Sequence, residues 1–290
     1  MIPPEVVAWR RAGRYVDTAV GSIFVRSGDG DDPIILLLHG YPSSSFDYRS
    51  VVPRLEGRAW LTLDFLGFGL SDKPRPHRYS LFEQADIVQQ VVADAGGGPV
   101  QLIAHDMGTS VATELFARDT DGRLPFELQR AVITNGSVIL ERASLRPSQK
   151  LLRGPLGPLI ARFVNRGGFI RGFGRLFSDD HPLSAVEAEA QWALLSYNDG
   201  AAIAHLLISY LEERVKHAAR WHGAVRDWPK PLSFLWGLRD PVATAAVLDG
   251  LRELRPHAEV IELAGVGHYP QVEVPDEFAR GALRLLASSG

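Results

Sequence analysis

The chain has 290 residues, of which 46% are hydrophobic and 22% are charged. These proportions are ordinary for a globular protein and exclude a disordered or collagen-like chain. The net charge of −3 gives no broad electrostatic footprint, so it predicts neither a nucleic-acid partner nor a membrane partner. The sequence has no cysteine, which excludes disulfides, thiolate catalysis and cysteine-ligated metals.

The first residues and the apolar runs of the chain predict a cytoplasmic protein. Residues 1–5 lack a basic stretch followed by an apolar one, so no secretory signal is expected. The apolar run 34–38 is far shorter than the roughly 18 residues of a membrane helix. We therefore expect a cytoplasmic protein, and its oligomeric state, a homodimer included, is left open.

Short apolar runs recur along the chain and predict buried strands. They cover 34–38, 60–63, 100–104, 131–134, 233–236 and 260–263, and 16–25 is typical of a strand pair. Helix-period segments at 80–94 and 107–119 lie between them, and Ser80 with Glu83 forms a capping-box pattern. This alternation predicts a mainly parallel sheet with helices on both faces.

The alternation stops between residues 138 and 226. That stretch contains Gly/Pro breaks and helical segments such as 184–195 and 201–220, without a buried-strand run. Because so long a structureless loop would be unusual in a compact domain, it predicts an inserted helical cap. We expect a core of residues 1–137 and 227–290 and a cap of residues 138–226.

Asp106 lies between an apolar strand and a helix, in Ala104-His105-Asp106-Met107-Gly108. The small residues on both sides match the nucleophile elbow, with aspartate where serine is usual. The helix N-terminus would stabilise the negative charge of the carboxylate. Taken alone, an aspartate at this position is also explained as a helix N-cap.

Two further polar residues follow predicted strands. Asp240 comes after the strand 233–236, and His268 comes after the strand 260–263. Each alone is also explained as a turn or loop residue, but nucleophile, acid and histidine occur in the order of a hydrolase triad. The segment that begins at His39-Gly40 follows an earlier strand, so the backbone N–H groups of Tyr41 and Met107 are expected to form an oxyanion hole.

These motifs resemble the Asp-nucleophile branch of the α/β-hydrolases, which holds epoxide hydrolases and haloalkane dehalogenases. The resemblance rests on His39-Gly40-Tyr41-Pro42, His105-Asp106-Met107-Gly108 and Gly267-His268-Tyr269-Pro270. The run 64–85 is also similar to the mesoderm-specific transcript family of the same superfamily. The resemblance implies an α/β-hydrolase fold, with a mainly parallel eight-stranded sheet and an inserted helical cap.

An aspartate nucleophile favours attack on saturated carbon. A carboxylate that attacks such a carbon leaves an ester, and water activated by His268 can attack the carbonyl of that ester. Asp240 would orient His268 and stabilise its imidazolium. The sequence therefore predicts a covalent ester on Asp106 that is hydrolysed in a second step.

The leaving group distinguishes the members of the branch. Dehalogenases resemble one another in a Trp after the nucleophile and usually an Asn after His-Gly, where this chain has Met107 and Tyr41. Epoxide hydrolases instead use cap tyrosines as proton donors. Tyr210 resembles one of these, and Tyr197, which precedes a turn signal, is a weaker match; both are also explained as aromatic packing.

We expect an epoxide hydrolase that converts small apolar epoxides and water to vicinal diols, without a metal or cofactor. His39, Phe65 and Trp192 are expected to contact the substrate. One alternative is a haloalkane dehalogenase or another hydrolase of the branch. A second is a non-catalytic ligand-binding protein on the same fold.

Overall fold

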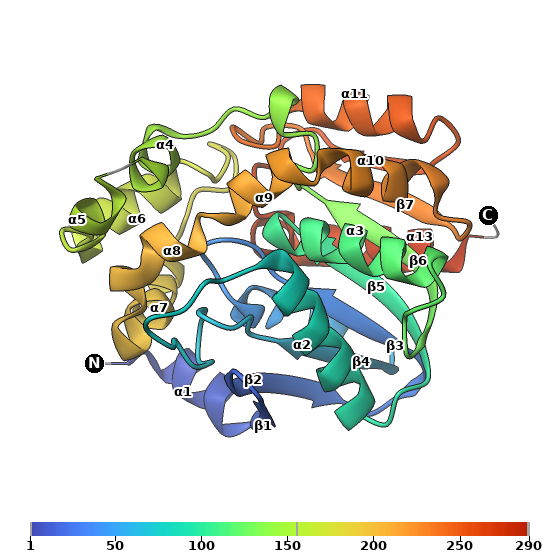
Figure 1. Cartoon of the computed structure of the whole chain (residues 1–290), viewed down its shortest axis with the longest axis horizontal. Helices are drawn as coiled ribbons and strands as arrows, with labels where there is room; N and C mark the ends of the chain where they lie inside the picture. Colours follow the sequence, from blue (N-terminus) through green and yellow to red (C-terminus); the bar gives the residue numbers. More distant parts are fainter. Residues whose placement is uncertain (1, 155, 289–290) are drawn as a thin grey trace.

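A single eight-stranded sheet organises the chain (Figure 1). The computed structural model describes residues 2–154 and 156–288. In spatial order the strands are β1 (Arg14–Thr18), β2 (Gly21–Gly28), β4 (Arg58–Leu63), β3 (Asp31–Leu38), β5 (Pro99–His105), β6 (Glu127–Thr134), β7 (Leu232–Gly237) and β8 (Val260–Leu263). β2 pairs antiparallel with β1 and β4, and β3 to β8 run parallel, so the expected mainly parallel sheet is confirmed.

Helices connect the strands and fill a long insertion. The α-helices are α1 (Pro4–Arg11), α2 (Leu81–Asp94), α3 (Met107–Thr120), α4 (Pro147–Arg153), α5 (Gly157–Ala161), α6 (Arg166–Gly174), α7 (Ala185–Ser196), α8 (Ala204–Leu207), α9 (Tyr210–Lys216), α10 (Ala218–Asp227), α11 (Ala245–Leu254), α12 (Pro270–Glu273) and α13 (Pro275–Ala287). Short 3-10 helices are η1 (Ser45–Tyr48), η2 (Val52–Arg54), η3 (Leu140–Arg142) and η4 (Tyr197–Ile203). Across residues 2–154 and 156–288, none of the helices is long and apolar enough to span a membrane.

The central strands are buried on both faces, as their continuous apolar runs predict. In β3, Leu36 and Leu38 belong to the core between the sheet and α2, α3, α10 and α11. Ile35 and Leu37 point the opposite way and pack in the core beneath α13, which contributes Phe278. This period of two holds the sheet between two helical layers and fixes which side of each strand faces which layer.

The carboxyl ends of the parallel strands meet at one edge of the sheet. Tyr41 follows β3, Asp106 follows β5, Asp240 follows β7 and His268 follows β8. Ligand sites of open α/β sheets lie at this edge. The fold therefore brings together residues that lie far apart in the sequence.

The chain between β6 and β7 lies beyond this edge, where α4, α5 and α6 extend away from the sheet (Figure 1). The helix expected over 201–220 is divided into the end of η4 and three helices, α8 to α10. α10 packs beside α3, where the Trp221 indole N–H donates to Glu114 at 3.1 Å. The last part of the expected cap thus lies in the helical layer that covers the sheet.

The start of α2 differs from its expected cap. The Ser80 hydroxyl accepts a hydrogen bond from the Phe82 N–H at 3.2 Å, so Ser80 is the N-cap. The Glu83 carboxylate bonds the His77 ring at 2.8 Å, so the reciprocal bond of a capping box is absent here. The sequence pattern located the helix start correctly, whereas the partner of Glu83 is set by the preceding loop.

The turn from β5 into α3 packs tightly against the end of β3. A Cβ atom at Gly108 would lie 2.6 Å from the His39 carbonyl oxygen and 2.7 Å from that of Leu38. Both neighbours are backbone atoms and cannot rotate away. The glycine at the end of the elbow motif is therefore required by the close approach of α3 to the sheet.

We expect Gly108→Ala to lower the free energy of unfolding by about 2 kcal/mol, because the added methyl group would force the backbone of two elements apart. Gly223→Ala is the matched control, since a Cβ there meets its nearest atom only at 3.9 Å. That control should raise stability by about 0.5 to 1 kcal/mol, as expected for glycine replacement in a helix. Urea denaturation measures both, and a Gly108→Ala protein as stable as the control would contradict this account.

Candidate active site

Asp106 occupies a strained turn. Its φ of 44° and ψ of −109° are rare for a residue other than glycine. The surrounding backbone holds it there: its N–H donates to the Thr134 carbonyl at 3.3 Å, and its carbonyl accepts from the Thr109 hydroxyl at 2.6 Å. The side chain is only 3% exposed. This is the conformation expected of a nucleophile elbow, with the carboxylate standing clear of the chain.

Asp240 and His268 form a buried hydrogen-bonded pair. The His268 Nδ1 lies 2.7 Å from the Asp240 Oδ2. The other Asp240 oxygen accepts from the N–H groups of Val242 and Ala243, at 2.7 and 3.0 Å. Burial opposes ionisation of Asp240, but the charge of His268 and these bonds lower its pKa overall. The carboxylate is therefore ionised and fixes the tautomer of the imidazole.

The charge state of His268 depends on its acidic neighbours. Burial alone would lower the pKa of the imidazole. The charge and hydrogen bond of Asp240, with smaller contributions from Asp106 and Glu273, raise that pKa to about 9 instead. His268 is therefore a cation at neutral pH, held chiefly by Asp240.

Asn135 is a site residue that the sequence analysis missed. It follows β6 with φ at 43°, and its amide nitrogen donates to Asp240 Oδ2 at 2.8 Å. Its amide oxygen accepts from the Gly237 N–H at 2.9 Å. Asn135 thus ties the ends of β6 and β7 together and positions the acid. A polar residue directly after a buried strand is the signal that could have indicated it.

The loop after β3 supplies one of the two expected oxyanion donors directly to Asp106. The Tyr41 N–H donates to Asp106 Oδ2 at 2.9 Å. Met107, the other expected donor, is the first residue of α3 and is buried. Free N–H groups at a helix start face an anion at this position. The placement of both residues is consistent with the expected oxyanion hole.

His39 and Phe65 do not contact the cavity and were wrongly expected to bind substrate. The His39 Nε2 accepts from the Phe65 N–H at 3.0 Å, so its proton is on Nδ1, which donates to the Gly40 carbonyl at 2.8 Å. Burial lowers the pKa of His39 to about 3, and the ring stays neutral. Phe65 is fully buried and packs on His39 at 4.6 Å. The pair braces the oxyanion loop against the end of β4.

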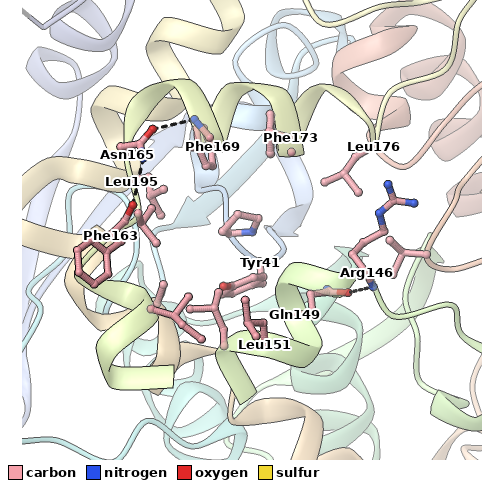
Figure 2. Close-up of a pocket in the computed structure, with 18 of the residues that line it drawn as sticks. Tyr41, Arg146, Gln149, Leu151, Phe163, Asn165, Phe169, Phe173, Leu176 and Leu195 are labelled. Carbon is pink, nitrogen blue, oxygen red and sulfur yellow. Dashed lines mark hydrogen bonds between the residues drawn. The ribbon is translucent and has the colours of Figure 1, made fainter. Parts of the chain in front are cut away.

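A cavity of about 250 Å³ lies between the cap and the carboxyl edge of the sheet (Figure 2). Tyr41, Pro42, Val242 and His268 line it from the core side. The cap contributes mainly aromatic and aliphatic side chains, among them Leu152, Ile160, Phe163, Phe169, Phe173 and Leu176. The cavity thus reaches Tyr41 and His268, the two lining residues that interact with Asp106. Its walls suit an apolar ligand.

Trp192 was also expected to bind substrate, but it does not line the cavity. Its ring lies 5.7 Å from that of Phe169, which does line the cavity. Trp192 therefore supports the wall from behind. The helical pattern of α7 placed it in the cap, but only the packing of α6 against α7 decides which aromatic ring reaches the cavity.

The two cap tyrosines lie in different places. Tyr210 is buried, and its ring lies 5.8 Å from that of Tyr41. Burial raises the pKa of Tyr210, and the charge of Asp106 raises it further. The Tyr210 ring lies 4.6 Å from the Arg214 guanidinium, which in turn lies 3.9 Å from Asp106 Oδ1. Tyr197 instead contacts the cations of Arg10 and Lys73, at 5.4 and 5.3 Å from its ring centre.

Tyr197 was therefore wrongly expected to act in catalysis. It lines a hollow beside α1, together with Val6 and Leu70. The turn at Asn198 and Asp199, where φ is 49° and 56°, directs the chain there. The second phenol beside Tyr210 belongs to Tyr41.

The comparisons with known proteins agree with this geometry. Residues 33–275 match the family model described as alpha/beta hydrolase fold. The chain belongs to the α/β-hydrolase family. It is 71% identical over 286 residues, covering 99% of both chains, to the Mycobacterium tuberculosis (strain ATCC 25618 / H37Rv) protein named "Putative hydrolase LipZ".

More distant similarities reach other branches of the family. The Homo sapiens mesoderm-specific transcript homolog protein is 34% identical over 301 residues, covering 99% of this chain and 89% of that protein, which confirms the sequence resemblance. The haloalkane dehalogenase DbeA from Bradyrhizobium elkani superposes with a TM-score of 0.78 at 22% identity, covering 96% of this chain and 99% of that one. That last similarity shows the shared fold.

A buried arginine adjoins the nucleophile of this α/β-hydrolase, and the sequence analysis missed it. The Arg214 Nη2 donates to the Asp106 carbonyl at 3.0 Å and lies 3.9 Å from its Oδ1. Nε donates to the Ser110 hydroxyl at 2.7 Å, and the guanidinium lies 4.6 Å from the Tyr210 ring centre. Since Arg214 follows Tyr210 by one helical turn, α9 brings a cation and a phenol to the carboxylate together.

We expect Arg214→Met to lower the free energy of unfolding by about 3 kcal/mol, because it leaves a buried carboxylate without one of its cations. Arg214→Lys should recover part of this loss, since it keeps the charge but loses the planar donor geometry. Arg226→Met is the control, because the ion pair of Arg226 with Asp227 is exposed and its loss should leave stability unchanged. Urea denaturation compares the three, and Arg214→Met as stable as the control would show that Asp106 needs no such cation.

Proposed function

We propose that this α/β-hydrolase is an epoxide hydrolase that forms a covalent ester on Asp106. The observation that carries the proposal is an aspartate at the elbow, hydrogen-bonded to the Tyr41 N–H and adjoining an intact His268–Asp240 pair. A serine alkoxide that attacked saturated carbon would leave an ether, which activated water does not hydrolyse. A carboxylate leaves an ester, which the rest of the site is built to hydrolyse.

In the first step a carboxylate oxygen of Asp106 attacks an epoxide carbon. The carbon–oxygen bond of the ring breaks, and the epoxide oxygen takes a proton from a phenol as it becomes an alcohol. The candidate donors are Tyr41, whose N–H bonds Asp106, and Tyr210, whose ring lies 5.8 Å from that of Tyr41. Because a nascent alkoxide is far more basic than a phenolate, a phenol of pKa about 10 or above is an adequate donor.

In the second step water attacks the ester carbonyl while His268 takes its proton. Tyr41 and Met107 would hold the oxyanion through their N–H groups, at about 3 kcal/mol for each donor. Collapse expels the second diol oxygen, which takes the proton back from His268. The carboxyl proton left on Asp106 then passes to His268, so the resting imidazolium and carboxylate are restored and one water has been consumed.

Ester formation lowers the pKa of His268. The charge of Asp106 makes a smaller contribution than Asp240 to the pKa of about 9 that keeps His268 protonated in the resting protein. Alkylation removes the Asp106 contribution, and the imidazolium passes its proton to the phenolate left by the first step before water attacks. Neutral His268 is then the base of the second step.

The epoxide as leaving group is favoured by what surrounds the nucleophile. A halide would need side-chain N–H donors, and neither Tyr41 nor Met107 supplies one. The Arg214 guanidinium does adjoin Asp106, but its Nε and Nη2 donate to the Ser110 hydroxyl and to the Asp106 carbonyl. The cavity wall is mainly apolar, and of the two phenols Tyr41 lines it, with the Tyr210 ring 5.8 Å away from the Tyr41 ring. A panel of styrene-type epoxides, haloalkanes and nitrophenyl esters separates the proposal from dehalogenase or esterase activity.

We expect His268→Gln to stop turnover while the ester accumulates on Asp106, because only the second step needs the base. Mass spectrometry of the intact protein after exposure to a styrene-type epoxide should show the added mass of one substrate, located on Asp106 after digestion. Asp106→Asn is the control and should stay unmodified. An inactive His268→Gln protein that never gains this mass, although the wild type makes diol, would contradict the two-step mechanism.

We expect Tyr210→Phe and Tyr41→Phe each to slow ester formation. In the double variant the rate of ester formation should fall by about 10² to 10⁴-fold, the usual contribution of a positioned proton donor. Hydrolysis of the preformed ester should stay nearly unchanged. Tyr197→Phe is the matched control and should react like the wild type, since its ring lies beside Lys73. Pre-steady-state kinetics measure both steps, and an unimpaired double variant would mean that the leaving group needs no proton.

A further inference from the structure

Positive charge is concentrated in one segment around the entrance of the cavity. Eight of the 31 basic residues, and none of the 34 acidic ones, lie between residues 142 and 175. This segment, which we call the basic cap segment, contains α4, α5 and α6. The overall net charge of −3 conceals this concentration.

Most of these cations are free to meet an external partner. In the cap segment, Arg142, Arg153 and Arg166 pair with carboxylates on α11, α9 and α7. The remaining five form no ion pair within the described parts of the chain, and four of them are exposed. They are Arg146, Lys150, Arg162, Arg171 and Arg175. A partner that docks here would therefore be anionic.

The same segment exposes large apolar side chains. Leu151, Leu156, Leu159 and Phe163 are 55%, 61%, 52% and 72% exposed. They make up half of the large hydrophobic residues that are exposed among the residues described, although α4 and α5 are short. Apolar residues gathered in this way on a surface mark an interaction site rather than random exposure.

The apolar patch is continuous with the cavity. Leu151 and Phe163 line the cavity and are also more than half exposed, so they stand at its opening (Figure 2). Leu152 on α4 and Ile160 on α5 also line the cavity. An apolar molecule that moved from the patch into the cavity would not have to cross a polar surface.

We propose that the basic cap segment docks on an anionic lipid surface, from which apolar substrates enter the cavity directly. The apolar side chains of α4 and α5 would enter the boundary between headgroups and acyl chains while the flanking cations bind lipid phosphates. A second copy of the chain fits this face poorly, because symmetric pairing would bring two basic segments together. The proposal does not depend on which reaction Asp106 carries out.

We expect the full-length protein to sediment with vesicles of phosphatidylcholine mixed with phosphatidylglycerol, but only weakly with phosphatidylcholine alone. Added salt should release it, because exposed charges are screened. Lys150→Glu with Arg162→Glu should weaken this binding at least tenfold, since a cation near an anionic bilayer contributes about a fivefold gain in affinity. Leu156→Ser with Leu159→Ser should weaken it as well.

The controls are matched by residue type and exposure. Val215→Ser removes an exposed apolar side chain on α9, and Arg280→Glu reverses an exposed charge on α13; both should bind vesicles like the wild type. The paired cap variants should keep wild-type turnover of a water-soluble substrate, because none of the four residues lines the cavity. Vesicle binding is measured without any turnover, so a failure of the epoxide proposal is recognised separately.

Two outcomes would overturn the proposal. One is a wild-type protein that binds neither kind of vesicle, or paired variants that bind as well as the wild type. The other is a dimer, seen by sedimentation equilibrium, that Leu156→Ser with Leu159→Ser dissociates. That result would assign the apolar patch to a second copy of the chain.

Discussion

The structure depends on compensating one buried carboxylate, that of Asp106. A side chain only 3% exposed loses most of its hydration, and an isolated charge there would be very costly. Three groups replace the water: the Tyr41 N–H at 2.9 Å, the Arg214 guanidinium at 3.9 Å and the His268 imidazolium. They come from the loop after β3, from the cap helix α9 and from the loop after β8. The loops at the edge of the sheet and α9 must therefore be correctly positioned relative to each other for all three groups to reach this carboxylate.

This arrangement links stability to chemistry. The charge of Asp106 is one of those that hold His268 protonated, and it disappears when Asp106 becomes an ester in the proposed reaction. α9 contributes Tyr210 and Arg214 from one face. The segment that carries α9 therefore supplies a cation to the buried Asp106 carboxylate.

Charge is distributed in two opposite ways in this protein. Around Asp106, opposite charges are matched within a few ångströms and are buried. In the basic cap segment, cations are exposed beside apolar side chains at the opening of the cavity. The first pattern compensates a buried charge, whereas five of the eight cations in the second form no ion pair within the described residues. For that reason the outer surface of the cap is where an external partner of this enzyme is best sought.

The sequence alone determined which segments form the buried strands and which three polar residues follow them. Buried strands have continuous apolar runs, and parallel strands put their carboxyl ends at one edge, so Asp106, Asp240 and His268 could be placed together from local patterns. The cap could not be read in this way, because its helices are short and their faces are chosen by packing. Tyr197 and Arg214 show the difference. Tyr197 lies away from the site, next to the turn at residues 198–199, whereas Arg214 lies one helical turn after Tyr210 on α9 and contacts Asp106. Neither residue has a motif, since contacts between distant segments decide its position.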